Sequence, residues 1–326
     1  MQQIEENEEK PKRLSFSETN DLLQISWDST SLGALKRCPR YYYYNIIMGY
    51  VHRGENAHLT FGSAYNNSLV YYQIRRANGI DYENAVVDAV RYALSSTWNE
   101  KLGRPWTSDE PTKTRETLVR TVIWYLDQFK DDVLETVIMA DGRPAVELPF
   151  RIDIGMHSEI TGEDYSLCGY LDQKVEGNLG RWIKDWKTTK YALDDKYFQR
   201  YTPDNQVSQY AFAGQIMDSK PVSGVVIDAA QLGVTFSRFQ RATIGRTTSQ
   251  LEEWITDSKF YIRQNEEFVA LNYWPQNDTS CEKYGGCPYR EICATTPKLR
   301  QTKLDAMFQT RIWDPLRERE ILGEVI

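Results

Sequence analysis

The sequence predicts a mixed α/β fold in which helices lie before, between and after the strands of a central sheet. The first indication is a change of pattern near residue 131: apolar residues recur at helical spacing before it and in strand-like runs after it. The second is a strong turn signal, Gly177-Asn178-Leu179-Gly180, between two such runs. The sequence shows no internal repeat and no long linker. One mixed core with a helical insertion is therefore the simplest arrangement.

The N-terminal part of the chain is expected to be helical. Residues 1–22 carry many charges and few apolar positions, so we expect them to form a disordered tail. Any residue of the run 28–31 can cap a first helix, which Pro39 would break or kink. Helical spacing predicts further helices in the region 23–130. Their expected ranges are 61–76, 82–101 and 112–129.

The central region, 131–270, is expected to form the sheet. Its strand-like runs are bounded by turn residues, and two of them flank the turn at 177–180. Helices are expected over 203–217 and 248–268. The remaining region, 271–326, holds a group of cysteines and a C-terminal helix. The expected strands are 136–140, 145–154, 167–176, 181–188, 222–230 and 235–244.

The two strands beside that turn carry charged residues that could act together. Period-two alternation puts Asp185 and Lys187 on one face of their strand. If the two strands pair as a hairpin, Asp172 lies across from the same face. Carboxylate oxygens bind hard divalent cations such as Mg²⁺, and a nearby lysine can orient or deprotonate a water molecule. The pattern indicates a metal site for phosphate chemistry, with an exposed, salt-bridged hairpin as the alternative.

Composition sets limits on the class of protein. The net charge of −7 argues against a purely electrostatic nucleic-acid binder, although a metal site tolerates acidic surroundings. No apolar run approaches the roughly 18 residues of a membrane span, so no contact with a membrane is expected. The charged N-terminus lacks the apolar segment of a signal peptide. A cytoplasmic protein is the expectation.

The hairpin resembles the core of the PD-(D/E)XK nuclease superfamily, in particular its RecB-like branch. That branch has glycine, two apolar residues and aspartate, followed by an apolar residue and Asp-x-Lys-Thr. Here the two parts read 169–172, Gly-Tyr-Leu-Asp, and 183–188, Ile-Lys-Asp-Trp-Lys-Thr, with Lys184 as a departure. The resemblance implies a restriction-endonuclease-like core. It also implies that Asp172 and Asp185 hold Mg²⁺ or Mn²⁺ and that Lys187 positions the attacking water.

Three further positions correspond to features of this branch. Gln206 and Tyr210 lie four apart on the expected helix 203–217 and resemble its Gln-x-x-x-Tyr motif, which implies contacts to the active site or the DNA backbone. An ordinary amphipathic helix is the alternative. Asn66 stands where the family has a metal-binding histidine, and an amide oxygen is a weaker ligand. Glu147 matches an acidic position on the strand before the core.

The cysteines form a second signal. Cys281, Cys287 and Cys293 are evenly spaced, which in a cytoplasmic protein indicates a metal rather than disulfides, either zinc or an iron–sulfur cluster. The spacing resembles the iron–sulfur staple of AddB-like and CRISPR-associated RecB-like exonucleases, in which an N-terminal cysteine supplies the fourth ligand. Cys38 matches that ligand and implies a 4Fe–4S cluster, whereas Cys168 is expected to be buried packing.

The resemblance implies a metal-dependent DNA exonuclease of recombination, repair or CRISPR-type processing. Its partner would be DNA, as single strands or duplex ends. A recombination or CRISPR protein and a second copy of the chain are further candidate partners. Two alternatives remain. One is an inactive RecB-like DNA-binding module, which Asn66 in place of histidine favours; the other is a zinc-stapled structural partner in a recombination complex.

Overall fold

The computed structural model describes residues 12–317, apart from positions 55, 179, 218, 219, 221, 283 and 284. These residues form two compact units whose segments alternate along the chain. The first unit comprises the described residues up to Arg53, then Arg151–Gly169, then Asp257 onward. The second comprises Gly54–Phe150 and Tyr170–Thr256. The elements β6 (Val146–His157), β7 (Asp164–Gly177) and α8 (Thr248–Ala270) each contribute residues to both units.

The second unit contains a mixed sheet, as the sequence predicts. The later part of β7 pairs antiparallel with β8 (Gly180–Thr189), which runs parallel to β9 (Val222–Leu232). In turn, β9 pairs antiparallel with β10 (Ser237–Ile244). The short β5 (Glu135–Thr136) and β6 also pair with β7. The expected strand at 136–140 is thus reduced to two residues, and one residue of the expected turn at 177–180 lies outside the described residues.

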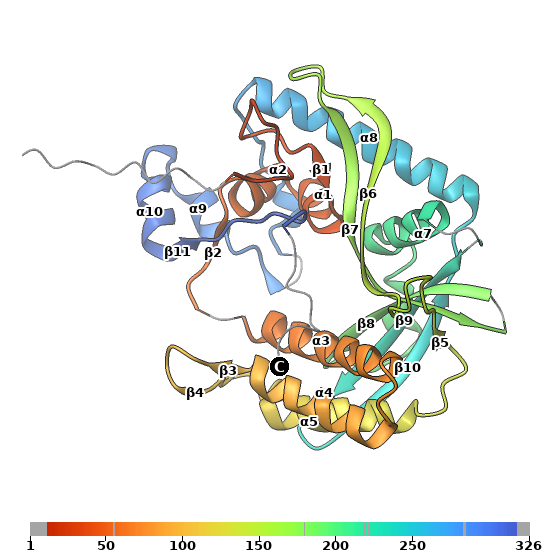
Figure 1. The fold of residues 1–326 in the computed structure, drawn as a ribbon. Helices are drawn as coiled ribbons and strands as arrows, with labels where there is room; N and C mark the ends of the chain where they lie inside the picture. Colours follow the sequence, from red (N-terminus) through yellow and green to blue (C-terminus); the bar gives the residue numbers. More distant parts are fainter. Residues whose placement is uncertain are drawn as a thin grey trace, which may run out of the picture. The chain divides into compact units, whose positions relative to one another are not determined.

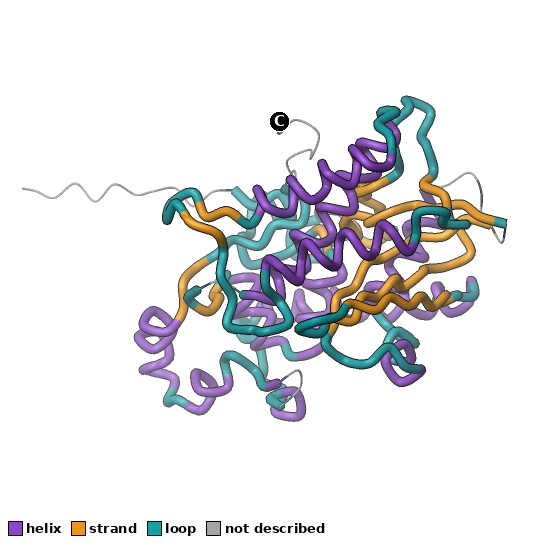
Figure 2. Tube along the Cα trace, turned by 90° about the horizontal axis from the view of Figure 1, so that it is seen from below, coloured by secondary structure: helices purple, strands orange, loops and turns teal. Residues whose placement is uncertain are grey.

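Helices cover the sheet of the second unit on both sides (Figure 1). On one side are α3 (Ala57–Ala77), α4 (Tyr82–Ser96) and α5 (Arg115–Gln128), whose N-caps Asn56, Asp81 and Thr114 accept hydrogen bonds from their first turns. Seen from below, long helices lie across the strands (Figure 2). Side chains of these helices bury Trp186 of β8 in one apolar core. The expected helix 82–101 is shorter because β3 (Trp98–Asn99) and β4 (Arg104–Pro105) form a small hairpin after it.

The other side of the same sheet carries α7 (Asn205–Met217), preceded by the short α6 (Asp195–Gln199). Gly214 allows α7 to approach closely, because a Cβ atom there would lie 3.2 Å from side-chain atoms of Ile183 and Val222. The strand β8 is therefore packed from both faces, with α7 on one and α3 and α5 on the other.

The first unit is built around short helices. α1 (Ser29–Arg37) begins with a capping box between Asp28 and Ser31, and α2 (Pro39–Tyr42) continues into a π-helical turn, Tyr43–Ile47. β1 (Ser26–Trp27) pairs with the start of β7, and β2 (Tyr50–His52) pairs with β11 (Phe308–Thr310). Further helices described in this unit include η2 (Asp278–Ser280), α9 (Arg290–Ala294), η4 (Pro297–Leu299) and α10 (Arg300–Met307).

The expected N-terminal tail is partly ordered. Residues 1–11 lie outside the described residues, but Phe16 pairs with Gln24 through a β-bridge and is buried. The prediction of disorder therefore does not hold for residues 12–22, because a few apolar side chains in this segment are enough to anchor it. Among the described residues, no helix combines the length and apolar character needed to span a bilayer.

Candidate active site

The hairpin of β7 and β8 brings two aspartates together. Gln173 pairs with Lys184 in the antiparallel register, and continuing that register by one residue places Asp172 opposite Asp185. Asp185 is only 1% exposed. The turn is short and the strands are joined directly, so the convergence follows from local sequence. The predicted meeting of these two carboxyl groups is what the structure shows.

Lys187 links this pair to α7. Its Nζ atom donates to Asp185 Oδ1 over 2.8 Å and to Gln206 Oε1 over 2.8 Å. Gln206 Nε2 donates to the Tyr210 hydroxyl over 3.1 Å, and that hydroxyl donates to Asp172 Oδ1 over 3.2 Å. A chain of hydrogen bonds thus runs from one aspartate to the other through three intervening side chains, those of Lys187, Gln206 and Tyr210. The five residues named as catalytic from the sequence lie in one cluster, and their roles in a reaction stay predictions.

The cluster carries more negative than positive charge. Burial and the neighbouring Asp185 raise the pKa of Asp172 well above its ordinary value, and Lys187 only partly opposes this. Burial lowers the pKa of Lys187, but Asp185 and Asp172 outweigh it and leave that pKa above its ordinary value. Asp185 Oδ2 is buried and lies 2.7 Å from Lys187 Nζ, yet it accepts no hydrogen bond of good geometry. A bound cation would relieve both the repulsion and the unmet oxygen.

Asn66 and Glu147 lie at the edge of this cluster. Asn66 Nδ2 donates to Glu147 Oε1 over 2.8 Å, while Asn66 Oδ1 is buried without a hydrogen-bond partner. Glu147 adds to the raised pKa of Asp172, after burial and Asp185, so its charge acts on the aspartate pair. The backbone of Glu147 has φ of +46°, a strained conformation for a residue with a side chain. Such strain is typical of residues held in place at functional sites.

The residues present fit a hard divalent cation. Among the described residues, no group of three or more histidine, cysteine, aspartate or glutamate side chains could hold a metal ion. Mg²⁺, however, keeps several water ligands and commonly binds through one or two carboxylates. Asp172 and Asp185 provide two carboxylates, and the unmet oxygens of Asp185 and Asn66 are of the type that such an ion takes.

The four cysteines singled out in the sequence lie together within the first unit. Cys38, Cys281, Cys287 and Cys293 line one pocket, and none of them forms a disulfide. Burial raises the pKa of the Cys287 thiol, and the nearby Cys281 and Cys38 contribute to the rise. The arrangement is not itself a metal-holding group among the described residues. Cys168 is fully buried elsewhere, as expected for a packing residue.

Two sets of residues near the hairpin were missed in the sequence. Lys113 is buried and donates to Thr188 Oγ1 over 3.3 Å, and burial lowers its pKa to about 8. No signal in the sequence marks it. The second set surrounds Lys184, which is also buried. Its signal was present: an ionisable residue at an apolar position of a strand requires a charged partner.

Comparisons with known proteins bear on this site. A model of the PD-(D/E)XK nuclease superfamily matches residues 27–294. No curated relative matches the sequence. Among solved structures, "Putative exonuclease" from Eubacterium rectale is 12% identical, with 86% of this chain and 95% of that one covered and a TM-score of 0.43. The protein SSO0001 is 11% identical, with 74% and 95% covered and a TM-score of 0.29. Neither structural likeness is close enough to carry an argument.

The family match spans most of the chain, including both aspartates and Lys187, and the chain therefore belongs to the PD-(D/E)XK nuclease superfamily.

Proposed function

We propose that this protein is a metal-dependent DNA exonuclease of the RecB-like branch, which hydrolyses phosphodiester bonds at DNA ends during recombination, repair or CRISPR-type processing. The observation that carries the proposal is the buried cluster of Asp172, Asp185 and Lys187, in which the lysine is held between a carboxylate and Gln206. Membership of a nuclease superfamily supports hydrolysis of nucleic acid.

The side chains of this cluster would have different roles in the reaction. A divalent Mg²⁺ or Mn²⁺ ion, when held by Asp172 and Asp185, supplies a Lewis acid that stabilises charge on the phosphate. Lys187 has three N–H donors and uses two on Asp185 and Gln206, which leaves one to orient a water molecule or a phosphate oxygen. The Lys187 side chain is 25% exposed, so part of it is in contact with solvent.

Tyr210 and the backbone of Trp186 fix the orientation of Asp172. The Tyr210 hydroxyl donates to one carboxylate oxygen, and the Trp186 amide donates to the other over 3.4 Å. Each oxygen of Asp172 thus has one donor and keeps lone pairs for a cation. Gln206 holds both Lys187 and Tyr210, so it couples the lysine to the aspartate.

The direct test is cleavage of end-labelled DNA by protein purified without oxygen. Linear single strands and duplexes are incubated with Mg²⁺, with Mn²⁺ or with chelator, beside a closed circular duplex. We expect short products from linear DNA only, and only with metal. Asp185→Asn is the inactive control, and Asp164→Asn, an exposed aspartate at the start of β7, is the matched active one. Cutting of the circle would point to an endonuclease. Binding without cleavage under every metal would favour the inactive DNA-binding module.

We further propose that Cys38, Cys281, Cys287 and Cys293 ligate a 4Fe–4S cluster that joins segments far apart in the chain. Four thiols lining one pocket are the ligand set such a cluster requires, and the resemblance of their spacing supports it. We expect about four irons and as many sulfides per chain after anaerobic purification. Serine at any of the four should cost iron and solubility, whereas Cys168→Ser should be mild. Stoichiometric zinc without iron would overturn the assignment.

A further inference from the structure

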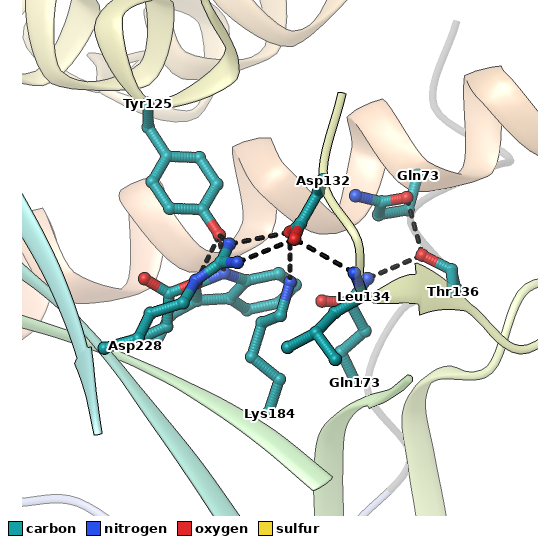
Figure 3. A network of polar contacts seen from close by, with 10 residues as sticks. Gln73, Tyr125, Asp132, Leu134, Thr136, Gln173, Lys184 and Asp228 are labelled. Carbon is teal, nitrogen blue, oxygen red and sulfur yellow. Dashed lines mark hydrogen bonds and ion pairs between the residues drawn. The ribbon is translucent and has the colours of Figure 1, made fainter. Parts of the chain in front are cut away.

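A second ionic cluster surrounds Lys184 of β8 (Figure 3). Side chains alternate along a strand, so Lys184 and Trp186 point away from the face that bears Asp185 and Lys187. The side chain of Lys184 is 3% exposed and that of Trp186 packs in the core with α3 and α5. The residue that departs from the family pattern thus belongs to this second cluster.

Asp132, just after α5, is the first anchor of the cluster. It accepts hydrogen bonds from Lys184 Nζ over 3.3 Å and from Arg241 Nη1 over 2.8 Å, and Arg241 Nη2 forms an ion pair with its other oxygen over 2.8 Å. Burial raises the pKa of Asp132, but Arg241 and Lys184 outweigh it and bring that pKa below its ordinary value. The two-pronged pairing with Arg241 fixes the direction of both groups.

Asp228 on β9 is the second anchor. Arg241 Nε donates to Asp228 Oδ2 over 2.7 Å, and the Tyr125 hydroxyl donates to the same oxygen over 2.6 Å. Tyr125 in turn accepts from Trp186 Nε1 over 2.9 Å. Strand register supports this meeting, because Asp228 is the partner of Trp186 across β8 and β9 and of Arg241 across β9 and β10.

The cluster is balanced, with two carboxylates, one ammonium and one guanidinium. It needs no further ion, and its members come from β8, β9, β10, α5 and the segment after α5. Figure 3 shows Lys184, Asp132, Tyr125 and Asp228 directed toward a common centre. Buried, mutually hydrogen-bonded charges of this kind define one arrangement of the surrounding strands, since alternatives leave a charge unpaired.

Trp186 connects this cluster to the reacting groups. It lies between Asp185 and Lys187 in the chain, and its backbone amide donates to Asp172 Oδ2 over 3.4 Å. Its indole is held by Tyr125 on the other face. Building on the proposed nuclease function, we propose that the cluster of Tyr125, Asp132, Lys184, Asp228 and Arg241 is a positioning device, which acts through Trp186 to set the geometry of Asp172, Asp185 and Lys187.

The test removes one hydroxyl and leaves every charge in place. In Tyr125→Phe, Trp186 and Arg241 each lose the hydroxyl as an acceptor and Asp228 loses it as a donor, while Asp228 keeps its ion pair with Arg241. The matched control is Tyr165→Phe in the first unit, which removes a buried hydroxyl that donates to Glu266 Oε1 over 2.9 Å. Both variants are compared with wild type in melting temperature, in kcat and KM on linear DNA, and in amide exchange of peptides from β8.

We expect Tyr125→Phe to lower kcat on the order of tenfold, with KM within about twofold, because small misplacements of catalytic groups are costly. Exchange of β8 amides should rise. Tyr165→Phe should lower the melting temperature comparably and leave kcat and β8 exchange unchanged. Trp186→Phe removes the other end of the hydrogen bond between Trp186 and Tyr125, so the loss of kcat in the double variant should be less than the product of the two single losses.

Three outcomes would overturn the inference. One is an unchanged kcat in Tyr125→Phe despite lost stability, and another is an equal loss of kcat in Tyr165→Phe. The third is unaltered β8 exchange in Tyr125→Phe, which decides the matter even if the wild-type protein cleaves nothing. If the wild-type protein cleaves nothing, raised β8 exchange in Tyr125→Phe would still support the positioning role, although the proposed nuclease activity would have failed. If Tyr125→Phe does not fold, Trp186→Phe provides the same comparisons.

Discussion

The two faces of β8 carry ionic clusters built from the same residue types, yet they differ in balance. On the front face, Asp172 and Asp185 share the single ammonium of Lys187. On the back face, Asp132 and Asp228 are matched by Lys184 and Arg241. A cluster with surplus negative charge is suited to take up a cation, whereas a balanced cluster is suited to hold its strands in place.

The pKa directions express the same difference. Burial and a neighbouring carboxylate raise the pKa of Asp172 well above its ordinary value. Asp132 is half-buried, and its partners bring its pKa below the ordinary value. The contrast is not complete, because Asp228 Oδ1 also lacks a hydrogen-bond partner. The front face nevertheless combines such an oxygen with unbalanced charge, and the back face does not.

The largest expected effect comes from the front face. Asp185→Asn and Lys187→Ala should each lower cleavage of linear DNA by roughly a thousandfold or more, because one removes a metal ligand and the other a contact to the transition state. DNA affinity measured in chelator should stay close to wild type, since phosphate affinity depends mainly on surface cations. A parallel loss of affinity would show that these residues bind DNA rather than act on it.

The second prediction is that removing a carboxylate changes the free energy of unfolding in opposite directions on the two faces. Asp132→Asn leaves Lys184 and Arg241 with one carboxylate between them and should lower the free energy of unfolding by about 3–5 kcal/mol. Asp172→Asn removes one of two repelling carboxyl groups and should stabilise the metal-free protein. Urea unfolding in chelator measures both. Equal destabilisation by the two substitutions would contradict the difference in charge balance.

The third effect concerns pH. The folded pKa of Asp172 is raised, so the folded state keeps a proton that the unfolded state has released, and stability is lost as pH rises through the folded pKa. Asp132 has a lowered folded pKa, so its contribution is present above about pH 4 and lost as pH falls. Each unit of difference between folded and unfolded pKa is worth about 1.4 kcal/mol.

The measurement is urea unfolding of the metal-free protein over a pH series, for wild type and Asp172→Asn. As pH rises above about 4, the ordinary carboxyl pKa, the free energy of unfolding of Asp172→Asn should increase relative to that of wild type. Added Mg²⁺ should reduce that difference, because bound cation favours the ionised carboxylates. A pH-independent difference would mean that Asp172 titrates normally in the folded protein.

The front cluster could be predicted from the sequence because its geometry is local. Asp172 and Asp185 belong to strands joined by a short turn, and Gln206 and Tyr210 are one helical turn apart. The back cluster could not be predicted in the same way. Asp132, Asp228 and Arg241 come close to Lys184 only through the register of β8, β9 and β10 and the path of the chain after α5. A single sequence shows neither. Only the unusual charge at Lys184 pointed to it.

Two segments depart from their local preference for the same physical reason. The segment 12–22 has the composition of a disordered tail, yet tertiary packing buries Phe16 and Ser15. The helix expected over 82–101 ends at Ser96, because the β3–β4 hairpin takes over from helical propensity. In both places contacts made by distant residues override the local preference of the chain.

The smallest expected effect tests how far the front face extends. Asn66 Oδ1 is buried without a hydrogen-bond partner, and its amide nitrogen holds Glu147, whose charge acts on Asp172. Imidazole nitrogen suits Mn²⁺ better than Mg²⁺, so Asn66→His should tighten apparent Mn²⁺ affinity about tenfold, roughly 1.4 kcal/mol, with little gain for Mg²⁺. Asn66→Ala should weaken both, and excess metal should partly restore activity. Activity titrated against each metal distinguishes the variants. If all three proteins titrate alike, Asn66 serves only to hold Glu147, and the cation would rest on Asp172 and Asp185 alone.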